Sequence, residues 1–282
     1  MSGDTLQIAK SGAGPDQLSA YAALLSEVFE AGPKFQPPSI AWRYRDNPAG
    51  PVVGADAWAG ARLAAHYVTC PTAARVEGAA MRGLLSLNTA THPDFQGKGL
   101  FTRLAEAAYA DGAAQGFDFV VGVANANSTP GFVRKLGFQL VAPLEAGVLP
   151  RTPRAFSERP VQYAADWSPE LLAWRLANPA ARYRRAVLGD LSAVWADTHL
   201  PFVRCAAFLP GRRVEGRAAP LGASLFIGLE PRLDLARHGL MPLPQRFRPS
   251  PLNLIYRPLS RRAPKALEPA AVSLSFLDFD PY

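Results

Sequence analysis

The stretch HPDFQGKGLFTRL, residues 92–104, changes character within a few positions. Pro93 ends an extended run, Gly97 and Gly99 flank Lys98, and a helical spacing of Leu and Ala begins directly afterwards. A strand that turns through glycines into a helix leaves backbone N–H groups without partners at the positive end of the helix dipole. Such donors bind anions, and the stretch therefore predicts a loop that holds a phosphate group.

The loop lacks the two most familiar phosphate-binding patterns, G-x-x-x-x-G-K-[ST] and G-x-G-x-x-G. Two glycines between a strand and a helix are also typical of a plain connecting turn. The neighbouring elements must therefore decide between a binding loop and a connection.

The segments around the loop predict alternating strands and helices. Apolar and alternating runs punctuated by glycine indicate a meander of antiparallel strands over residues 52–91. Helical spacing follows from residue 98 to about residue 114, and the apolar run 117–125 has the length of a strand. A short helix is then expected, because Ser128 suits its N-cap and Gly137 suits the position after its last turn.

The composition indicates a globular protein. The chain has 282 residues, 49% of them hydrophobic, and its mean hydropathy is near zero. No run approaches the roughly 18 apolar residues of a membrane span, and the N-terminus lacks the pattern of a signal peptide. We therefore expect a cytoplasmic protein without a membrane partner. The two cysteines, Cys70 and Cys205, are far apart, and the four histidines lack metal-ligand spacing, so we expect no metal site.

The chain is basic, with a formal charge of +7 and a pI near 9.7. Much of the excess is arginine in the second half. This charge fits either a solvated surface or an anionic ligand. No nucleic-acid-binding motif accompanies it, which favours a small phosphorylated ligand over nucleic acid.

Two domains are expected. The Pro- and Arg-rich segment 146–162 is the best candidate for a linker between domains at 1–145 and 163–282. AWRYRDNPAG at 41–50 returns as AWRLANPAAR at 173–182, and both copies lead into strand-like runs. This faint repeat fits either chance or a duplicated architecture.

Two signatures in the first domain resemble the GNAT N-acyltransferase superfamily. HPDFQGKGLFTRL is similar to its acyl-CoA loop, [QR]-x-x-G-x-[GA], beginning at Gln96. VANANSTPGFVRKLGF, residues 123–138, is similar to its second signature, an Asn-bearing strand end, a short helix and a terminal Gly-Phe. The resemblance implies an α+β, or α/β, GNAT fold: a mixed, mostly antiparallel sheet with flanking helices, followed here by a second, degenerate GNAT-like half.

The resemblance also implies a site for acetyl-CoA or another acyl-CoA. Loop amides would hold the pyrophosphate, one strand would pair with the pantetheine arm, and the second signature would line its other side. The implied cofactor-binding residues are Leu87, Asn88, Thr89, Gln96, Gly97, Lys98, Gly99, Leu100, Phe101, Thr102, Asn125, Asn127 and Phe132.

Two positions depart from the family pattern. Phe101 stands where the family usually has Gly or Ala, so its ring must point away from the pyrophosphate. Val133 stands where the family commonly has the tyrosine that protonates the departing thiolate. No Glu lies on the predicted central strand to serve as the base. The candidate catalytic residues that remain are His66, Asp278 and Asp280, whereas His92 is expected to be structural.

The expected activity is transfer of an acetyl or other short acyl group from acyl-CoA to a primary amine of a small molecule. A looser resemblance, to two-half GNAT proteins that acylate nucleotide-linked amino sugars, would give Trp42, Arg43 and Tyr44 a role in binding the acceptor. A non-catalytic acyl-CoA-binding protein, a protein or peptide acetyltransferase and a nucleic-acid-associated protein remain the alternatives. A monomer or a homodimer is expected.

Overall fold

The chain forms two compact units in this computed structural model, which describes residues 6–29, 32–198, 200, 202–216, 222–244 and 250–279. The first unit comprises residues 1–73, 81–140 and 255–266, and the second comprises residues 74–80, 141–254 and 267–282. Relative to the boundary predicted near residue 145, the segment 255–266 goes with the first unit and the segment 74–80 goes with the second.

The sheet of the first unit has the strand order β1-β2-β3-β4-β5-β14-β6. Neighbouring strands β1 and β2, and β2 and β3, are antiparallel, whereas β4 and β5 are parallel. The strands are β1 (Leu6–Lys10), β2 (Val53–Ala59), β3 (Arg62–Val76), β4 (Ala79–Thr91), β5 (Phe119–Ala124), β6 (Gln139–Pro143) and β14 (Asn253–Pro258).

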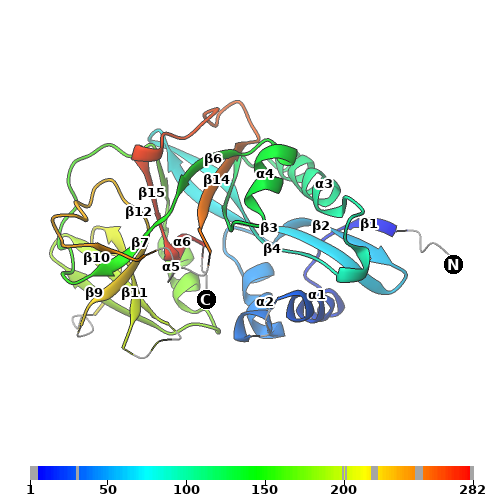
Figure 1. Cartoon of the computed structure of the whole chain (residues 1–282), viewed down its shortest axis with the longest axis horizontal. Helices are drawn as coiled ribbons and strands as arrows, with labels where there is room; N and C mark the ends of the chain where they lie inside the picture. The colour runs from blue at the N-terminus through cyan, green and yellow to red at the C-terminus, as the bar shows by residue number, and fades with distance from the viewer. Residues whose placement is uncertain are drawn as a thin grey trace. The chain divides into compact units, whose positions relative to one another are not determined.

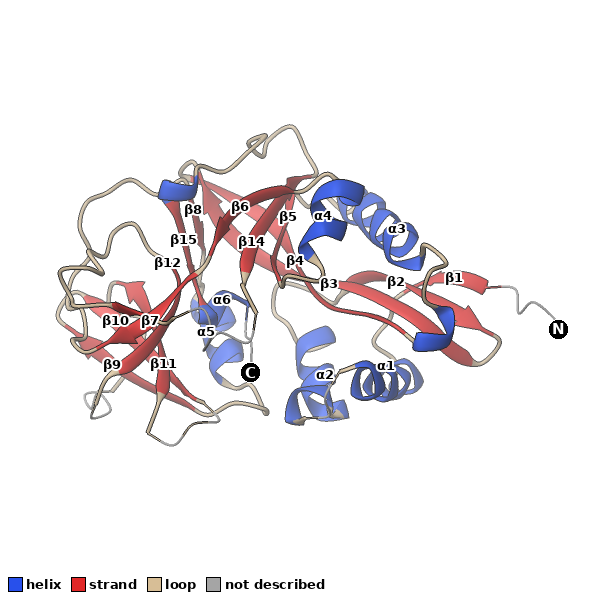
Figure 2. Cartoon of the chain, in the orientation of Figure 1, coloured by secondary structure: helices blue, strands red, loops and turns tan. Residues whose placement is uncertain are grey.

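Helices cover both faces of this sheet (Figures 1 and 2). One core cluster joins α1 and α2 to the sheet, and a second joins α3 and α4 to the opposite face. The helical elements are α1 (Pro15–Val28), η1 (Pro33–Phe35), α2 (Pro37–Tyr44), η2 (Pro93–Phe95), α3 (Leu100–Ala114) and α4 (Thr129–Leu136).

Local sequence explains where these helices begin and end. Pro15 and Pro37 occupy the first helical positions of α1 and α2, where the missing N–H of proline costs nothing. Gly137 ends α4 in the left-handed conformation, with φ of 66°, as its position in the sequence predicts. Helix α2 was not predicted from the sequence.

The second unit has its own core. Its strands are ordered β8-β15-β12-β11-β10-β9, and β7 pairs with both β12 and β13. Its elements are β7 (Glu145–Leu149), β8 (Tyr163–Ala165), α5 (Pro169–Leu176), β9 (Tyr183–Leu188), β10 (Leu191–Asp197), β11 (Arg204–Pro210), β12 (Ser224–Leu229), β13 (Met241–Pro242), η4 (Pro269–Ala271), β15 (Val272–Ser275) and α6 (Phe276–Phe279). Most of β7 lies in the predicted linker 146–162.

The two units repeat one order of elements. In the first, α2 leads into the meander β2-β3-β4, and β5 lies parallel to β4. In the second, α5 leads into the meander β9-β10-β11, and β12 lies parallel to β11. The described residues between β11 and β12 contain no helix, whereas η2 and α3 stand between β4 and β5. The second half therefore repeats the strands of the first, and its described residues hold no counterpart of α3.

The repeated Asn-Pro element makes the same turn in both units. Asn47 is buried and its Oδ1 accepts the N–H of Ala49 at 3.0 Å, while Asn178 is buried and accepts the N–H of Ala180 at 2.9 Å. Asn47 also donates from Nδ2 to the carbonyl of Pro71 at 2.9 Å. These bonds fix the exit of each helix toward the strand that follows.

Replacing Asn47 tests the structural role of this turn. Asn47→Ala leaves a buried carbonyl and a partly buried N–H without their partner, so we expect the free energy of unfolding to fall by about 1–3 kcal/mol. Urea denaturation followed by tryptophan fluorescence measures the change. The neighbouring exposed substitution Asp46→Ala is the control and should stay within about 0.5 kcal/mol. Equal stability of Asn47→Ala and wild type would contradict this role.

Candidate functional site

The glycine loop links η2 to α3 in the first unit. Gly97 and Gly99 have φ of 74° and 69°, which side-chain-bearing residues adopt only at a cost. Gly99 is the N-cap of α3; no side chain caps this end, and the first turn contains no acidic residue. The N–H groups of Leu100, Phe101 and Thr102 therefore precede the first intrahelical hydrogen bond, between Arg103 N–H and the Gly99 carbonyl. The helix end has the donors and polarity of an anion site.

The loop is exposed and has open space over both glycines. A Cβ placed on Gly97 or Gly99 would meet no atom within 4 Å, so only the backbone conformation selects glycine here. Lys98 lies with its Nζ 4.8 Å from the ring centre of Phe95, which is buried beneath the loop. This contact keeps a positive charge at the loop.

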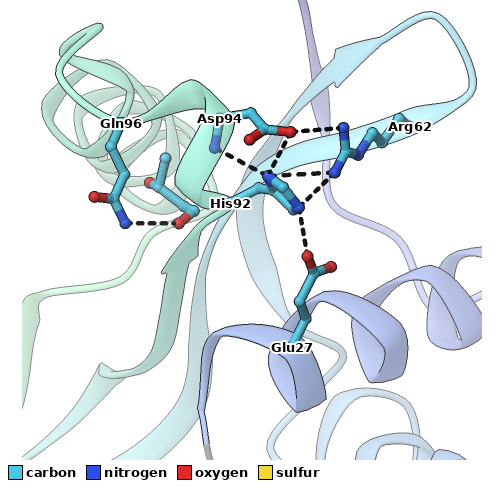
Figure 3. Close-up of polar contacts among 6 residues, drawn as sticks. Glu27, Arg62, His92, Asp94 and Gln96 are labelled. Carbon is cyan, nitrogen blue, oxygen red and sulfur yellow. Dashed lines mark hydrogen bonds and ion pairs between the residues drawn. The ribbon is translucent and has the colours of Figure 1, made fainter.

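His92 holds the start of the loop in place (Figure 3). The backbone N–H of Asp94 donates to its Nδ1 at 3.1 Å, and its Nε2 lies 2.6 Å from Glu27 Oε1. Arg62 contacts the same ring and donates to Asp94 Oδ2 at 3.0 Å. The imidazole is 4% exposed and ties the loop to α1 and β3, which is the structural role that the sequence predicted.

Strands β4 and β5 separate close to the loop. They form four residue pairs, from Gly83–Phe119 to Ser86–Gly122, yet β4 continues to Thr91. From Leu87 onward, the β4 edge that faced β5 therefore loses this partner strand. The predicted pantetheine-binding residues Leu87, Asn88 and Thr89 lie in this opening, and all three are half-buried.

Asn88 breaks the alternation of β4. Its φ is 49°, a left-handed conformation that is uncommon in a strand. Before it, Leu84 packs on the α3 side and Leu87 on the α1 side of the sheet. After it, Ala90 packs on the α1 side, although strict alternation from Leu87 would turn Ala90 to the other face. The inward–outward alternation of β4 is therefore shifted by one residue at Asn88, whose side chain is directed toward α2.

The second signature contributes mainly to packing and capping. Oδ1 of Asn125 accepts hydrogen bonds from the N–H groups of Asn127 and Ser128 at 3.1 and 2.9 Å and so shapes the turn before α4, while Asn127 itself is exposed. Phe132 is 5% exposed and belongs to the core, which leaves little of its ring to line a ligand. Phe101 packs edge-on against it with ring centres 5.2 Å apart, so its ring points into the core as the loop pattern requires.

The three predicted acceptor-binding residues are all buried. Trp42 and Arg43 are each 7% exposed and Tyr44 is fully buried, which leaves no open aromatic face on them for stacking. The hydroxyl of Tyr44 is 3.1 Å from His66 Nε2 and 3.1 Å from Asn88 Nδ2. His66 is also fully buried, with Nδ1 2.6 Å from Asp56 Oδ1. The structure thus brings His66, Tyr44 and Asn88 together, but His66 has no surface on which an amine could bind.

The candidate Asp278 belongs to the second unit and caps a helix. Its Oδ2 accepts the backbone N–H and the hydroxyl of Ser275, at 2.5 and 2.9 Å, immediately before α6. Both bonds run from Ser275 to the carboxylate, so Asp278 supplies the half of a capping box in which the third helical residue reaches back to the N-cap. Burial raises the pKa of Asp278 to about 6. The other candidate, Asp280, lies outside the described residues.

A family model for the acetyltransferase (GNAT) domain matches residues 12–141. The chain carries a GNAT domain. The matched segment contains the glycine loop, the separated strands β4 and β5, and α4. The recognition of this superfamily from its two signatures is therefore confirmed.

Solved structures extend the comparison beyond the GNAT domain. A probable N-acyltransferase from Enterococcus faecalis V583 has a TM-score of 0.64 at 11% identity, covering 90% of this chain and 73% of that one. A tandem GNAT protein from the clavulanic acid biosynthesis pathway has a TM-score of 0.53 at 11% identity, and the match covers 90% of this chain and 99% of that one. Saccharomyces cerevisiae N-myristoyltransferase, solved with myristoyl-CoA, has a TM-score of 0.59 at 9% identity, and the match covers 97% of this chain and 90% of that one.

These likenesses show the fold. The chain has the fold of a two-half GNAT protein, with a mixed sheet and flanking helices, as predicted. No curated protein matches the sequence. Over the described ranges, no three His, Cys, Asp or Glu side chains gather so as to hold a metal ion. None of the helices in that part of the chain is long and apolar enough to cross a membrane.

Sequence reasoning missed Asp56, which pairs with the predicted His66 in the GNAT domain. A signal was present, because an aspartate stands in the middle of the apolar run VVGADAWA, residues 52–59. A carboxylate on a fully buried strand requires partners. Asp56 is fully buried and accepts a hydrogen bond from the hydroxyl of Tyr21 at 2.6 Å.

Replacing His92 tests the anchoring of the glycine loop. His92→Ala removes the acceptor for Asp94 N–H and the contact with Glu27, so we expect about 1–2 kcal/mol less stability and weaker acyl-CoA binding. Thermal denaturation and titration calorimetry with CoA measure the two effects. His92→Asn retains an N-cap acceptor and should recover most of the stability. An unchanged CoA affinity in a folded His92→Ala variant would contradict the anchoring role.

The raised pKa of Asp278 predicts a pH dependence of stability. Between about pH 4 and pH 6 the folded chain keeps a proton that the unfolded chain releases. Wild-type stability should therefore fall by up to about 3 kcal/mol as pH rises through this window. Asp278→Asn should remove this part of the pH dependence of the free energy of unfolding. Its stability relative to wild type should therefore be greatest above pH 6. Urea denaturation from pH 4 to 7 measures the free energy of unfolding of both proteins. The same pH dependence in wild type and Asp278→Asn would refute the effect.

Proposed function

We propose that this protein is an acyl-CoA-dependent N-acyltransferase that moves an acetyl or other short acyl group to the primary amine of a small molecule. The GNAT domain supports acyl transfer in general. The observation that carries the proposal is the adjacency of an uncapped helix end at Gly99 to strands that separate after Ser86.

The loop suits the phosphate end of acyl-CoA. The N–H groups from Gly97 to Thr102 lie at the positive end of the 15-residue helix α3, and no side chain of the described residues caps that end. Lys98 adds a positive charge, and the absence of Cβ atoms at both glycines allows a pyrophosphate to approach the backbone. These residues supply hydrogen bonds and charge without metal ligands.

The opening between β4 and β5 suits the pantetheine arm. An extended chain with amide groups binds a free strand edge by backbone hydrogen bonds, and Leu87–Thr89 offers such an edge. The left-handed backbone at Asn88 reorients the peptide groups around it. A backbone N–H in this region would polarise the thioester carbonyl and stabilise negative charge as it develops there.

The proposed acceptor class is a small amine that carries negative charge. The formal charge of +7 favours an anionic substrate, and nucleotide-linked amino sugars combine a diphosphate with a primary amine. They are therefore the first compounds to test, alongside polyamines and amino acids.

A second candidate is acyl-CoA binding without catalysis. Val133 stands on α4 where the family pattern commonly has a tyrosine, and β4 contains no glutamate. His66, the remaining predicted base in the GNAT domain, is fully buried. These observations favour firm acyl-CoA binding even if no amine is acylated.

Calorimetry and a thiol-release assay test both candidates. Wild type should bind acetyl-CoA and release CoA faster in the presence of at least one amine of the panel. Gly99→Ala forces a side chain into the left-handed conformation at the loop, and we expect about tenfold weaker CoA binding. Gly137→Ala is the matched control: φ is 66°, its Cβ would also meet open space, and it ends α4 away from the loop.

The outcomes separate the candidates. CoA binding with amine-dependent release supports the N-acyltransferase, and binding without release on any amine supports the non-catalytic protein. Absence of CoA binding, or equal weakening by Gly99→Ala and Gly137→Ala, would overturn the assignment of the glycine loop.

A further inference from the structure

A continuous chain of buried polar groups runs through the first unit to the opening between β4 and β5. Asp56 contacts His66 at 2.6 Å, His66 contacts the Tyr44 hydroxyl at 3.1 Å, and that hydroxyl contacts Asn88 Nδ2 at 3.1 Å. The first three side chains are fully buried, and Asn88 is half-buried. The chain thus joins a carboxyl group in the core to a side chain at the proposed site.

Asp56 fixes one end of the chain as a hydrogen-bond acceptor. In addition to His66, the hydroxyls of Tyr21 and Ser11 donate to it at 2.6 and 2.8 Å. Two hydroxyl groups already donate to this carboxyl group, one to each oxygen, so it acts as the acceptor toward its third contact as well. The hydrogen between His66 and Asp56 therefore belongs to Nδ1 of the imidazole.

The acceptor role of Asp56 sets the direction of the other hydrogen bonds in the chain. A neutral imidazole with its proton on Nδ1 presents Nε2 as an acceptor, so the Tyr44 hydroxyl donates to it. Burial raises the pKa of Tyr44 well above its ordinary value, which keeps that proton on the hydroxyl. The Tyr44 oxygen is then left to accept, and the amide nitrogen of Asn88 must be the group that faces it.

The orientation of Asn88 follows. With Nδ2 held by Tyr44, its amide oxygen is the free end of the side chain, and no described residue donates to that oxygen. Asn88 lies two residues beyond Ser86, the last β4 residue paired with β5. The polar chain therefore presents one acceptor, in one orientation, at the opening of the sheet.

We propose that the Asn88 side-chain oxygen accepts an N–H of the acceptor amine, and that Tyr44, His66 and Asp56 are positioning residues that fix its orientation. This inference rests on the proposed N-acyltransferase function. A hydrogen bond from one N–H aligns the nitrogen lone pair with the thioester carbon. The nitrogen gains positive charge as its bond to carbon forms, so the hydrogen bond strengthens toward the transition state.

Steady-state kinetics with the amine found in the release assay test the proposal. Asn88→Ala should lower kcat/KM for the amine by about 100-fold, a larger factor than any rise in the Kd for acetyl-CoA that calorimetry measures for the same variant. Tyr44→Phe should lower it by about two- to tenfold, because the amide then populates both orientations. His66→Gln retains an acceptor near Nε2 and should be more active than His66→Leu.

Tyr109→Phe is the matched control for Tyr44→Phe. It removes a buried hydroxyl from α3, which is hydrogen-bonded to Tyr67 on the other face of the same sheet. It should lower stability without changing kcat/KM for the amine. Full turnover by folded Asn88→Ala, or equal losses in Tyr44→Phe and Tyr109→Phe, would overturn the inference.

Nitrogen-15 NMR of the wild-type histidines supplies a readout that does not depend on turnover. His66 should be neutral with its proton on Nδ1, and Tyr44→Phe should shift the Asn88 side-chain amide signals. A protonated imidazole, or a proton on Nε2 alone, would reverse the hydrogen bonds and overturn the proposed orientation. Failure of the wild type to acylate any amine would instead refute the proposed function, and with it the amine as the partner of Asn88.

Discussion

The short pairing between β4 and β5 is the constraint on which the rest of the first unit depends. Parallel strands normally stay hydrogen-bonded along their shared length, yet these two form four residue pairs and stop at Ser86 and Gly122. Backbone groups beyond that point need other partners, and an extended amide-bearing ligand can supply them. The glycine loop follows on the same strand. One break in the sheet therefore creates a free strand edge, and the same strand leads through the glycine loop to the uncapped N-terminus of α3.

The left-handed backbone at Asn88 makes this break compatible with a packed core. It lets Leu87 and Ala90 face the same helices, α1 and α2, and it turns a polar side chain toward Tyr44. Two features of this arrangement are unfavourable by themselves. The backbone of Asn88 is strained, and the buried carboxyl group of Asp56 would cost several kcal/mol without hydrogen-bond donors. Donors from β1, α1 and β3 satisfy that carboxylate. A network of this kind rigidifies the structure only when every member is satisfied.

Sequence reasoning recovered what is encoded locally. Gly97, Gly99 and Gly137 mark turns whose backbone angles favour glycine, so the loop and the end of α4 were predictable. Helix α2 was missed although Pro37 at its first position is a recognised start signal. The polar chain was not predictable, because the residues it joins are separated by up to 44 positions, between Tyr44 and Asn88. The break in side-chain alternation at Asn88 depends on what packs against β4, and nothing in the sequence of β4 marks it.

The second half shows which parts of this plan are structural and which belong to the site. It retains the helix, the Asn178 turn, the meander and a parallel fourth strand, and these elements are sufficient to build a core. The helix that would cap a phosphate loop has no counterpart in the described residues between β11 and β12. The buried arginine after the repeated tryptophan persists in both halves, as Arg43 and Arg175, so it belongs to the scaffold. The glycine loop and the polar chain ending at Asn88 have no counterpart in the described residues of the second half, which is why the proposals for binding and catalysis rest on them.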